Sequence, residues 1–477
     1  MVNKMSGFSQ KDEKFRHYAL SAHPMKLLLT VCMPLALYHA LQTVFRLLDT
    51  LMASHISSDA VSAVAALSQI TLMLNALGTG LSVGGSIKIS EAYGEGNDEL
   101  VRRRVSTVYA MAILVSLAAA ATLIPFAPAF LHLLGTPEDL IVTGVGYFRV
   151  EVLTLVITFF NTVYLAIERS RGHTRKILVL NLCVITIKLV LSAFFIYVIK
   201  GGLILMALAT LAGQILLLSY ALISGRKDEG AFRFSLHNIH FKKETVLPIL
   251  NLSYPVAAEN VLFSAGKVIV NSMSGIYGSL TVGALSISNN IAGLTNSWHT
   301  GLSDGTSPLI SQNRGAKQYR RTLQIYYSLL LINTVIGVLG LIIISPCMDR
   351  LAEIFALSQN HFDTEFRDMI ISIHKWEMVA YITLGINAAT VALLLGYGYT
   401  KLTLILNVTR VFVFRVPVLW AFQHHTNLGA EAVGLTMMIS NVCTGIMAIA
   451  IAIPVVRKIR KLIREEETQN EIERRPV

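Results

Sequence analysis

A row of polar side chains interrupts the first apolar segment of the sequence. Its members are Tyr38, Gln42, Arg46 and Asp49. Their spacings of four, four and three residues place them on one face of a helix. A charge inside a long apolar helix is costly and normally faces a cavity or a partner. Asp49 is therefore a candidate for a carboxylate that alternately binds and releases a proton. A static ion pair with Arg46 is the structural alternative, because residues three apart can touch.

Lys188 is a second ionisable residue inside an apolar run, which extends over residues 177–199. Its ammonium group would repel a sodium ion bound nearby, and a buried lysine can also lose its proton. The alternative is that the side chain snorkels to the membrane surface, which a central position disfavours. The position of Lys188 predicts a role in ion coupling or in substrate binding.

Two later segments, 60–87 and 282–310, each have a stripe of polar residues along one helical face. Such stripes suit the walls of a water-filled cleft, whereas helix packing through small polar residues is the alternative. Packing does not explain the charge of Asp304. We therefore favour the cleft, and we predict that three residues of these stripes bind substrate. They are Asn75, Asn296 and Asp304.

Segment 247–274 has an acidic and a basic residue, Glu259 and Lys267, about 12 Å apart on one face. Glu259 either attracts a cationic substrate or lies solvated near the end of the segment. We place both residues, with Tyr38 and Gln42, in the predicted substrate site. Further aromatic candidates for the wall of a site for a flat cation are Trp298 and Phe263. Glu151 lies near the start of its apolar run and is expected to be solvated.

Several other chemistries lack their sequence signatures. There is no Gly-x-x-x-x-Gly-Lys-[Ser/Thr] motif, and neither a Ser-His-Asp set nor a metal-ligand cluster stands out. The four cysteines are distributed over different segments without pairing or ligand spacing, so they are expected to be small core residues. They are Cys32, Cys183, Cys347 and Cys443. We predict that the protein is not an enzyme and needs no cofactor.

The elements that must position these residues are membrane helices. Of the 477 residues, 53% are hydrophobic and only 14% are charged, whereas a soluble domain has about 25% charged residues. Runs of about 20 apolar residues, enough to cross the hydrocarbon core, recur along the chain. The predicted helices are 27–53, 60–87, 105–131, 144–168, 177–199, 202–224, 247–274, 282–310, 322–346, 376–396, 402–422 and 430–456.

The distribution of basic residues predicts the orientation of these helices. Of the 40 Lys and Arg residues, 30 lie in the N-terminal segment, the even-numbered loops and the C-terminal segment, and only four lie in the odd-numbered loops. Basic loops stay in the cytoplasm, so both termini are predicted to be cytoplasmic. The same distribution explains the net charge of +11 without nucleic-acid binding, and it indicates contact with anionic lipid at the inner (plasma) membrane.

An internal repeat divides the chain into two similar halves. At a shift of 221 residues, Thr79-Gly80-Leu81-Ser82 matches Thr300-Gly301-Leu302-Ser303, and Pro34 matches Pro255. A block around Gly172 to Asn181 matches the block around Gly398 to Asn407 at a shift of 226. Six helices per half give both halves the same direction, as in transporters with parallel repeats and a central site between the halves.

The motifs in this repeat resemble the multidrug and toxic compound extrusion (MATE) family. Leu48-Asp49-Thr50 is similar to the family's motif near the end of helix 1, Gly94-Glu95-Gly96-Asn97 to the loop after helix 2, and Gly305 to Lys317 to the exit of helix 8. The resemblance implies two six-helix bundles in a V shape and export of cationic or amphipathic compounds. It also implies that an inward flow of protons or sodium ions drives the export.

The chain departs from the family at two places. Lys188 and Ser192 stand where members often have an Asn and an Asp that complete a cation site with the helix 1 carboxylate, and Glu259 lies one turn before the acidic residue of several members. We therefore predict a coupling site of Asp49, Lys188, Arg46 and Ser192.

We predict a multi-pass, proton-coupled antiporter that exports cationic or amphipathic small molecules and is a monomer. Sodium-coupled export and a flippase for a lipid-linked oligosaccharide are the alternatives. The predicted parts are a cytoplasmic segment 1–26, bundles 27–224 and 247–456, a cytoplasmic linker 225–246 and a charged tail 457–477.

Overall fold

The computed structural model describes residues 7–53, 58–133, 138–199, 203–228, 230–358, 361–362 and 364–473. Almost all of this part of the chain is helical, with one antiparallel pair of two-residue strands, β1 (Leu357–Ser358) and β2 (His361–Phe362). The side chains of residues 46–53 and 58–70 lie outside the described part, so the structure gives no contacts for Arg46 and Asp49. The prediction of an all-α membrane protein is confirmed.

The chain forms two compact units, and each is described by itself. Unit 1 comprises residues 1–21 and 44–261, and unit 2 comprises residues 22–43 and 262–477. Two helices, α3 (Met33–Ala53) and α10 (Lys243–Ser274), therefore begin in one unit and end in the other. The boundaries of the compact units therefore differ from those of the two halves of the sequence, because each unit includes part of a helix from the other half.

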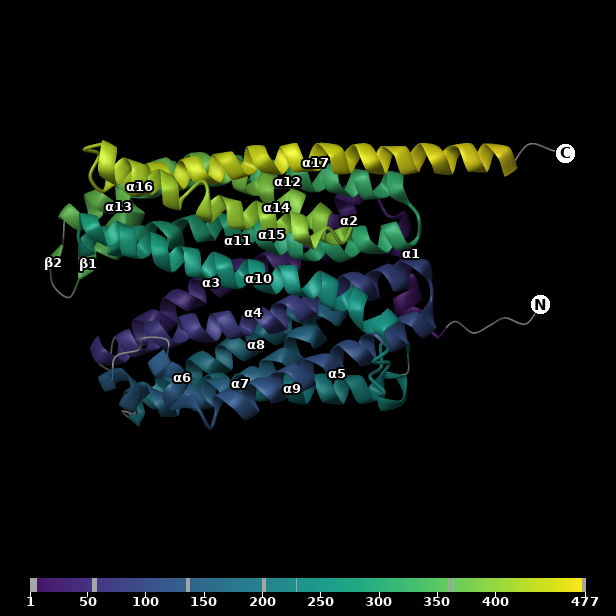
Figure 1. Ribbon diagram of the computed structural model, residues 1–477, viewed down its shortest axis with the longest axis horizontal. Helices are drawn as coiled ribbons and strands as arrows, with labels where there is room; N and C mark the ends of the chain where they lie inside the picture. The colour runs from purple at the N-terminus through teal and green to yellow at the C-terminus, as the bar shows by residue number, and fades with distance from the viewer. Residues whose placement is uncertain are drawn as a thin grey trace. The chain divides into compact units, whose positions relative to one another are not determined.

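Unit 1 is organised around one long central helix (Figure 1). This helix, α7 (Glu138–Ser170), packs against α4, α5, α6 and α9, and α8 packs against α9. The remaining elements of the unit are α1 (Gln10–Ser21), α4 (Ser58–Glu95), α5 (Asp98–Leu123), α6 (Ala127–Leu133), α8 (Thr174–Ala193), the π-helical turn η1 (Phe194–Val198), α9 (Leu203–Lys227) and the 3₁₀ turn η2 (Leu236–Asn238).

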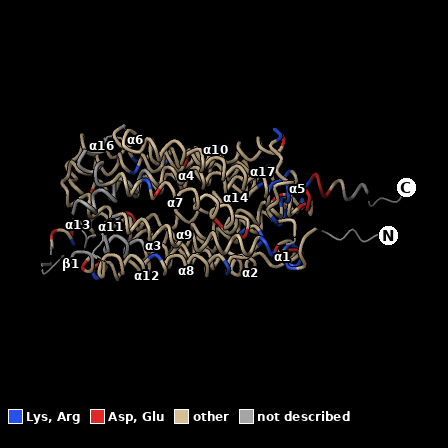
Figure 2. Tube along the Cα trace, turned by 90° about the horizontal axis from the view of Figure 1, so that it is seen from below, with Lys and Arg blue, Asp and Glu red and all other residues tan. Residues whose placement is uncertain are grey.

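Unit 2 has the equivalent arrangement around α14 (Tyr381–Gly396), which packs against α11, α12 and α17. Its remaining elements are α2 (Pro24–Val31), the 3₁₀ turn η3 (Gly275–Tyr277), α11 (Ser279–Gly315), α12 (Tyr319–Ala356), α13 (Thr364–Glu377), the 3₁₀ turn η4 (Met378–Ala380), α15 (Thr400–Phe412), α16 (Val416–His425) and α17 (Glu431–Glu473). Many Lys and Arg residues lie in α1, at the start of α5 and in the later part of α17 (Figure 2).

Each of the twelve predicted segments corresponds to a helix or to a broken helix. Within the described residues, ten helices are long and apolar enough to cross a membrane. The predicted segments absent from these ten are α4 and α11, the two helices with polar stripes. Four segments break where a continuous span was predicted, at Cys32, at residues 124–126, at residues 378–380 and at residues 413–415. Conversely, α12 continues through Pro346 to Ala356 and α13 begins at Thr364, so that the two helices together replace most of the predicted long connection 347–375.

Large apolar side chains cover much of the outer surface of each unit. Leu114 of α5, Val190 of α8 and Ile342 of α12 are each more than 60% exposed. Exposure of so many apolar side chains to water would be energetically unfavourable, whereas contact with lipid chains, which are equally apolar, is not. These faces therefore identify the membrane-facing surfaces.

Repeat-equivalent glycines lie where the parts of α3 and α10 that belong to the other half's unit pack against its helices. In unit 2, a Cβ at Gly301 would collide with the backbone of Ala36, so α3 lies directly against α11. In unit 1, the repeat-equivalent Gly80 has the same relation to Ser253 and Ala257 of α10. Ala36 and Ala257 are also equivalent at the shift of 221 residues. The same glycine–alanine contact between helices therefore occurs in both units.

The N-terminal segment contains a helix, α1, that the sequence analysis did not predict. Helix α1 begins with a reciprocal cap, in which the backbone N–H of Asp12 donates to Ser9 Oγ and Ser9 Oγ–H donates to the Asp12 carboxylate. The pattern Ser9-x-x-Asp12 is a capping-box signal that could have predicted this helix. Buried Asp12 then fixes α1 to unit 1 through Arg171 at the end of α7.

A cysteine at Leu236 is expected to be protected from external labelling in intact cells. This side chain is 76% exposed and lies in the basic linker 225–246, which the distribution of charge places in the cytoplasm. The variant requires replacement of the native cysteines, since Cys183 and Cys347 are exposed. A membrane-impermeant maleimide should react with Leu236→Cys only after permeabilisation, and with Leu428→Cys from outside. The reverse pattern would overturn the orientation.

Candidate functional site

The first part of α3 and the middle of α11 bring a histidine and an aspartate together in unit 2. His39 Nε2 lies 3.2 Å from Asp304 Oδ2, and the two side chains are 21% and 34% exposed. Tight packing at Gly301 and Gly305 holds the two helices together on this face. The repeat-equivalent positions in unit 1 are Asn260 and Val83, so the fold itself does not require this charged pair.

Other polar groups accompany this pair on the same two helices. Thr43 Oγ1 and Ser297 Oγ are 2.7 Å apart, and the ring of Tyr38 lies 5.2 Å from the ring of His39. Asn289 and Asn296 of α11 are exposed. Of the predicted residues on these two helices, Tyr38, Gln42 and Asp304 are half-buried and Asn296 is exposed.

Lys267 also belongs to unit 2, where it is exposed on α10. Its ammonium nitrogen lies 5.0 Å from the ring centre of Phe263, and the guanidinium of Arg410 lies 5.4 Å from the same ring. Phe263 is therefore already in contact with two cations of the protein. This arrangement argues against its predicted use as a wall for a cationic substrate.

In unit 1, Lys188 of α8 has a carboxylate for a neighbour. Its charge interacts with Glu151 of α7, which also forms a hydrogen bond with Tyr147. The Cβ of Lys188 faces Gly213 of α9, where the missing side chain leaves space. The expectation that Glu151 is solvated overlooked this interaction, because a lysine on another helix cannot be aligned with it from sequence spacing.

The remaining predicted residues of unit 1 have different environments. Ser192 is 1% exposed, and its hydroxyl has no hydrogen-bond partner within the described part of the chain. Asn75 is half-buried and donates to the backbone oxygen of Thr71. Glu259 is half-buried on α10. Arg46 and Asp49 lie outside the described side chains, so their predicted roles are not tested.

A buried polar cluster in unit 2 was not predicted from the sequence. Ser288 Oγ lies 2.6 Å from a carboxylate oxygen of Glu377 and 2.9 Å from His374 Nδ1. His374 Nε2 lies 2.9 Å from the hydroxyl of Tyr381. The spacing of His374, Glu377 and Tyr381 along the chain could have indicated a shared helical face.

Two arginines, the half-buried Arg410 of α15 and the buried Arg415 between α15 and α16, extend this cluster toward α17. Arg410 donates to Asn441 Oδ1 over 2.7 and 3.0 Å, and Arg415 donates to Ser440 and Asn441 over 3.1 Å. Both arginines also interact with the charge of Glu377. Their hydrogen bonds hold the break between α15 and α16, where Arg415 is 4% exposed.

A partly exposed carboxylate such as that of Asp304 can attract a cation. Among the residues that the structure describes, no group of three His, Cys, Asp or Glu side chains has a metal-binding arrangement.

Comparison with known proteins gives consistent matches over most of the chain. The MatE family model matches residues 34–194 and 255–421. A probable multidrug resistance protein of Bacillus subtilis, YoeA, is 24% identical over 406 residues, which cover 83% of this chain and 86% of that protein. An FAD transporter of Shewanella oneidensis is 24% identical over 452 residues, with coverage of 91% and 95%.

The fold has a close counterpart among solved structures. A multidrug resistance MATE family transporter of the MOP superfamily, solved in an outward-facing conformation, superposes with a TM-score of 0.88. The match is 20% identical and covers 95% of this chain and 99% of the other.

Proposed function

The chain belongs to the MatE family of multidrug efflux transporters, and on this premise we propose that it is a secondary active antiporter that exports cationic or amphipathic small molecules in exchange for protons. It works in the plasma (inner) membrane as a monomer with both termini in the cytoplasm. The observation that supports this proposal best is the partly exposed His39–Asp304 pair on the polar face of α3 and α11. It gives a cation a carboxylate to bind and gives a proton a competing site.

Cationic substrate is proposed to lie against the polar face of unit 2. Asp304 supplies the negative charge, and Tyr38, Gln42 and Asn296 supply aromatic and amide groups. Asn75 and Glu259 of unit 1 and Lys267 of unit 2 are also proposed to contact substrate. A protonated His39 stabilises the charge of Asp304, so uptake of a proton and binding of a cation oppose each other.

Ion coupling is proposed to depend on Asp49, with Arg46, Lys188 and Ser192 around it. Protonation of Asp49 would leave Lys188 paired with Glu151 alone, which favours one side of the transport cycle. A sodium ion about 4 Å from the ammonium of Lys188 would be repelled by about 4 kcal/mol at an effective dielectric of about 20. Glu151 offsets part of this repulsion, but a proton on Asp49 avoids it entirely.

Arg410 and Arg415 do not favour the flippase alternative. A flippase for a lipid-linked oligosaccharide would need basic side chains open to a central cavity. Arg415 is 4% exposed and Arg410 is half-buried, and both donate hydrogen bonds to Ser440 or Asn441 instead. Sodium-coupled export therefore stays the main competitor of the proposed proton coupling.

Uptake of a fluorescent organic cation into proteoliposomes with an acidic lumen is expected to follow the proton gradient and to continue without sodium. Proteoliposomes with a proton gradient alone should accumulate the cation, and each addition of substrate should release protons that a pH dye detects. A sodium gradient with the proton gradient collapsed should give no accumulation. Sustained accumulation in that second condition would overturn proton coupling, and no accumulation in either would overturn antiport.

A further inference from the structure

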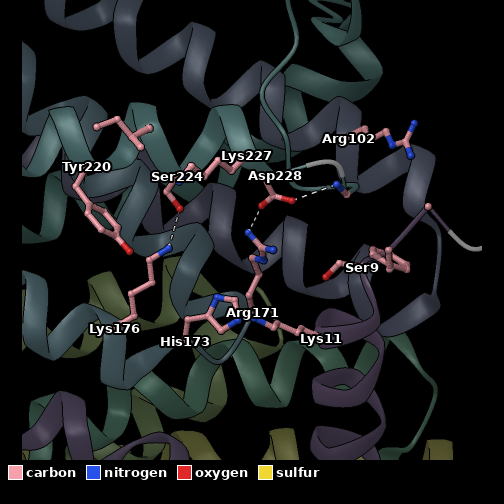
Figure 3. A pocket seen from close by; sticks show the side chains of 14 residues that line it. Ser9, Lys11, Arg102, Arg171, His173, Lys176, Tyr220, Ser224, Lys227 and Asp228 are labelled. Atoms are coloured by element: carbon pink, nitrogen blue, oxygen red, sulfur yellow. Dashed lines mark hydrogen bonds and ion pairs between the residues drawn. The ribbon is translucent and has the colours of Figure 1, made fainter.

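A cavity of about 750 Å³ lies at the end of unit 1 where α1, α5, α8 and α9 meet. Five basic side chains line it, with a single carboxylate, Asp228 (Figure 3). The basic residues are Lys11, Arg102, Arg171, Lys176 and Lys227. The transport mechanism proposed above uses none of them.

Arg171 forms the rigid floor of this basic cavity. It is 8% exposed, its Nε lies 2.8 Å from Asp12 Oδ1, and it also pairs with Asp228 and, at 3.5 Å, with Glu168. Burial alone would lower the pKa of Arg171, but hydrogen bonding and the charges of these carboxylates outweigh it and raise the pKa above its usual range. The floor therefore keeps its charge at every working pH.

Lys176 is held on one wall of the cavity by polar and aromatic groups. Its amine lies 3.0 Å from Ser224 Oγ, and Glu168 lies 3.2 Å from it. The rings of Tyr164 and Tyr220 lie 5.3 Å from the same nitrogen. In Figure 3 the amine points toward Tyr220 and Ser224, so it is positioned in advance beside the cavity.

Lys11 and Lys227 give the cavity positive charge that no carboxylate of the described residues pairs with. Both side chains are exposed, and within the described part of the chain neither has an ion pair with a carboxylate. Arg102 lies 4.0 Å from Asp98, with both side chains about 40% exposed, so its charge is only weakly offset. All three of these side chains line the cavity that an anion would enter.

The cavity opens at the boundary between apolar and basic surface on α9. Ile215, Leu222 and Ile223 are exposed on this helix, and Ile223 itself lines the cavity. Arg226 and Lys227 follow within one turn. Acyl chains cover such an apolar face, and headgroups lie where the basic residues begin.

We propose that this cavity binds the phosphate headgroup of an anionic phospholipid. The acyl chains lie along the exposed face of α9, and the phosphodiester lies between Lys11 of α1 and Lys227 of α9, with Lys176 beside it. A basic pocket between helix ends at a membrane surface is the arrangement that selects anionic headgroups. Because Lys11 is on α1, the lipid would also fasten the N-terminal helix to unit 1.

The test uses the purified full-length chain in detergent, stripped of lipid. Short-chain phosphatidylglycerol is expected to raise the thermal unfolding midpoint and to appear as bound lipid in native mass spectra, whereas phosphatidylcholine is not. The double variant K11Q/K227Q should weaken the apparent affinity for phosphatidylglycerol by about tenfold or more, since each basic residue near an anionic headgroup contributes about 1 kcal/mol. Both lysines are exposed, so the variant should fold normally.

The matched control is K242Q/K243Q, which removes two exposed lysines of unit 1 that do not line the cavity. It should bind phosphatidylglycerol as the unmodified protein does. Equal loss of affinity in both double variants, or equal stabilisation by phosphatidylcholine, would overturn the site. Equal stabilisation by inorganic phosphate or glycerol phosphate would overturn the lipid as its ligand and assign a soluble anion instead.

Discussion

Asp49→Asn is expected to abolish uphill export while leaving the protein folded and able to bind substrate. Asparagine keeps the size of the side chain and removes only its capacity to exchange a proton. Because coupling is proposed to depend on proton exchange at Asp49, the proton gradient should no longer drive accumulation, and the variant should only equilibrate a cation across the membrane. Accumulation of a fluorescent cation in proteoliposomes and the substrate-induced release of protons measure the two parts of this effect.

The matched comparison is Asp304→Asn, which also removes one carboxylate and disrupts the pair with His39. This variant should keep uphill export but require a higher concentration of cationic substrate for half-maximal rate. The two variants therefore distinguish a site for the proton from a site for the substrate. If Asp304→Asn loses uphill export and Asp49→Asn keeps it, the described pair and not the helix 1 motif couples export to protons.

Arg171→Met is expected to destabilise unit 1 by about 3–5 kcal/mol, because it leaves buried carboxylates without their cation. Asp12 is completely buried, and Arg171 also pairs with Glu168 and Asp228. The loss should appear as a lower thermal unfolding midpoint of the purified protein. It should also expose α1 to limited proteolysis, since Asp12 connects this helix to α7.

The control for this stability effect is Arg103→Met, on the surface of α5. Arg103 pairs with Glu99, but their side chains are 45% and 71% exposed, so water screens the pair. Its loss should cost less than about 1 kcal/mol. Equal destabilisation by the two substitutions would show that the buried network around Arg171 stabilises unit 1 no more than the exposed Arg103–Glu99 pair does.

The helical architecture followed from local features of the sequence. Apolar runs long enough for the membrane, such as 322–346 in α12, predict helices because unpaired backbone groups are too costly in lipid. The match of Gly80 with Gly301 at a shift of 221 residues helped to predict the internal repeat. In both units a neighbouring helix leaves no space for a side chain at this position, so each half of the sequence has a glycine there. The capping pattern Ser9-x-x-Asp12 was equally local but lay outside the apolar runs on which the prediction depended.

Contacts between distant segments were decided only by the tertiary structure. Asp304 was identified from the polar stripe of α11, but its partner His39 lies on another helix, and the sequence contains nothing that aligns the two. The same holds for Lys188 and Glu151, and for Arg171, whose charge is balanced by residues from α1, α7 and the end of α9. Helix periodicity fixes which residues share a face, whereas the pairing of faces depends on how helices pack. For that reason the sequence determined which side chains were available for transport, and the packing of each unit determined which of them meet.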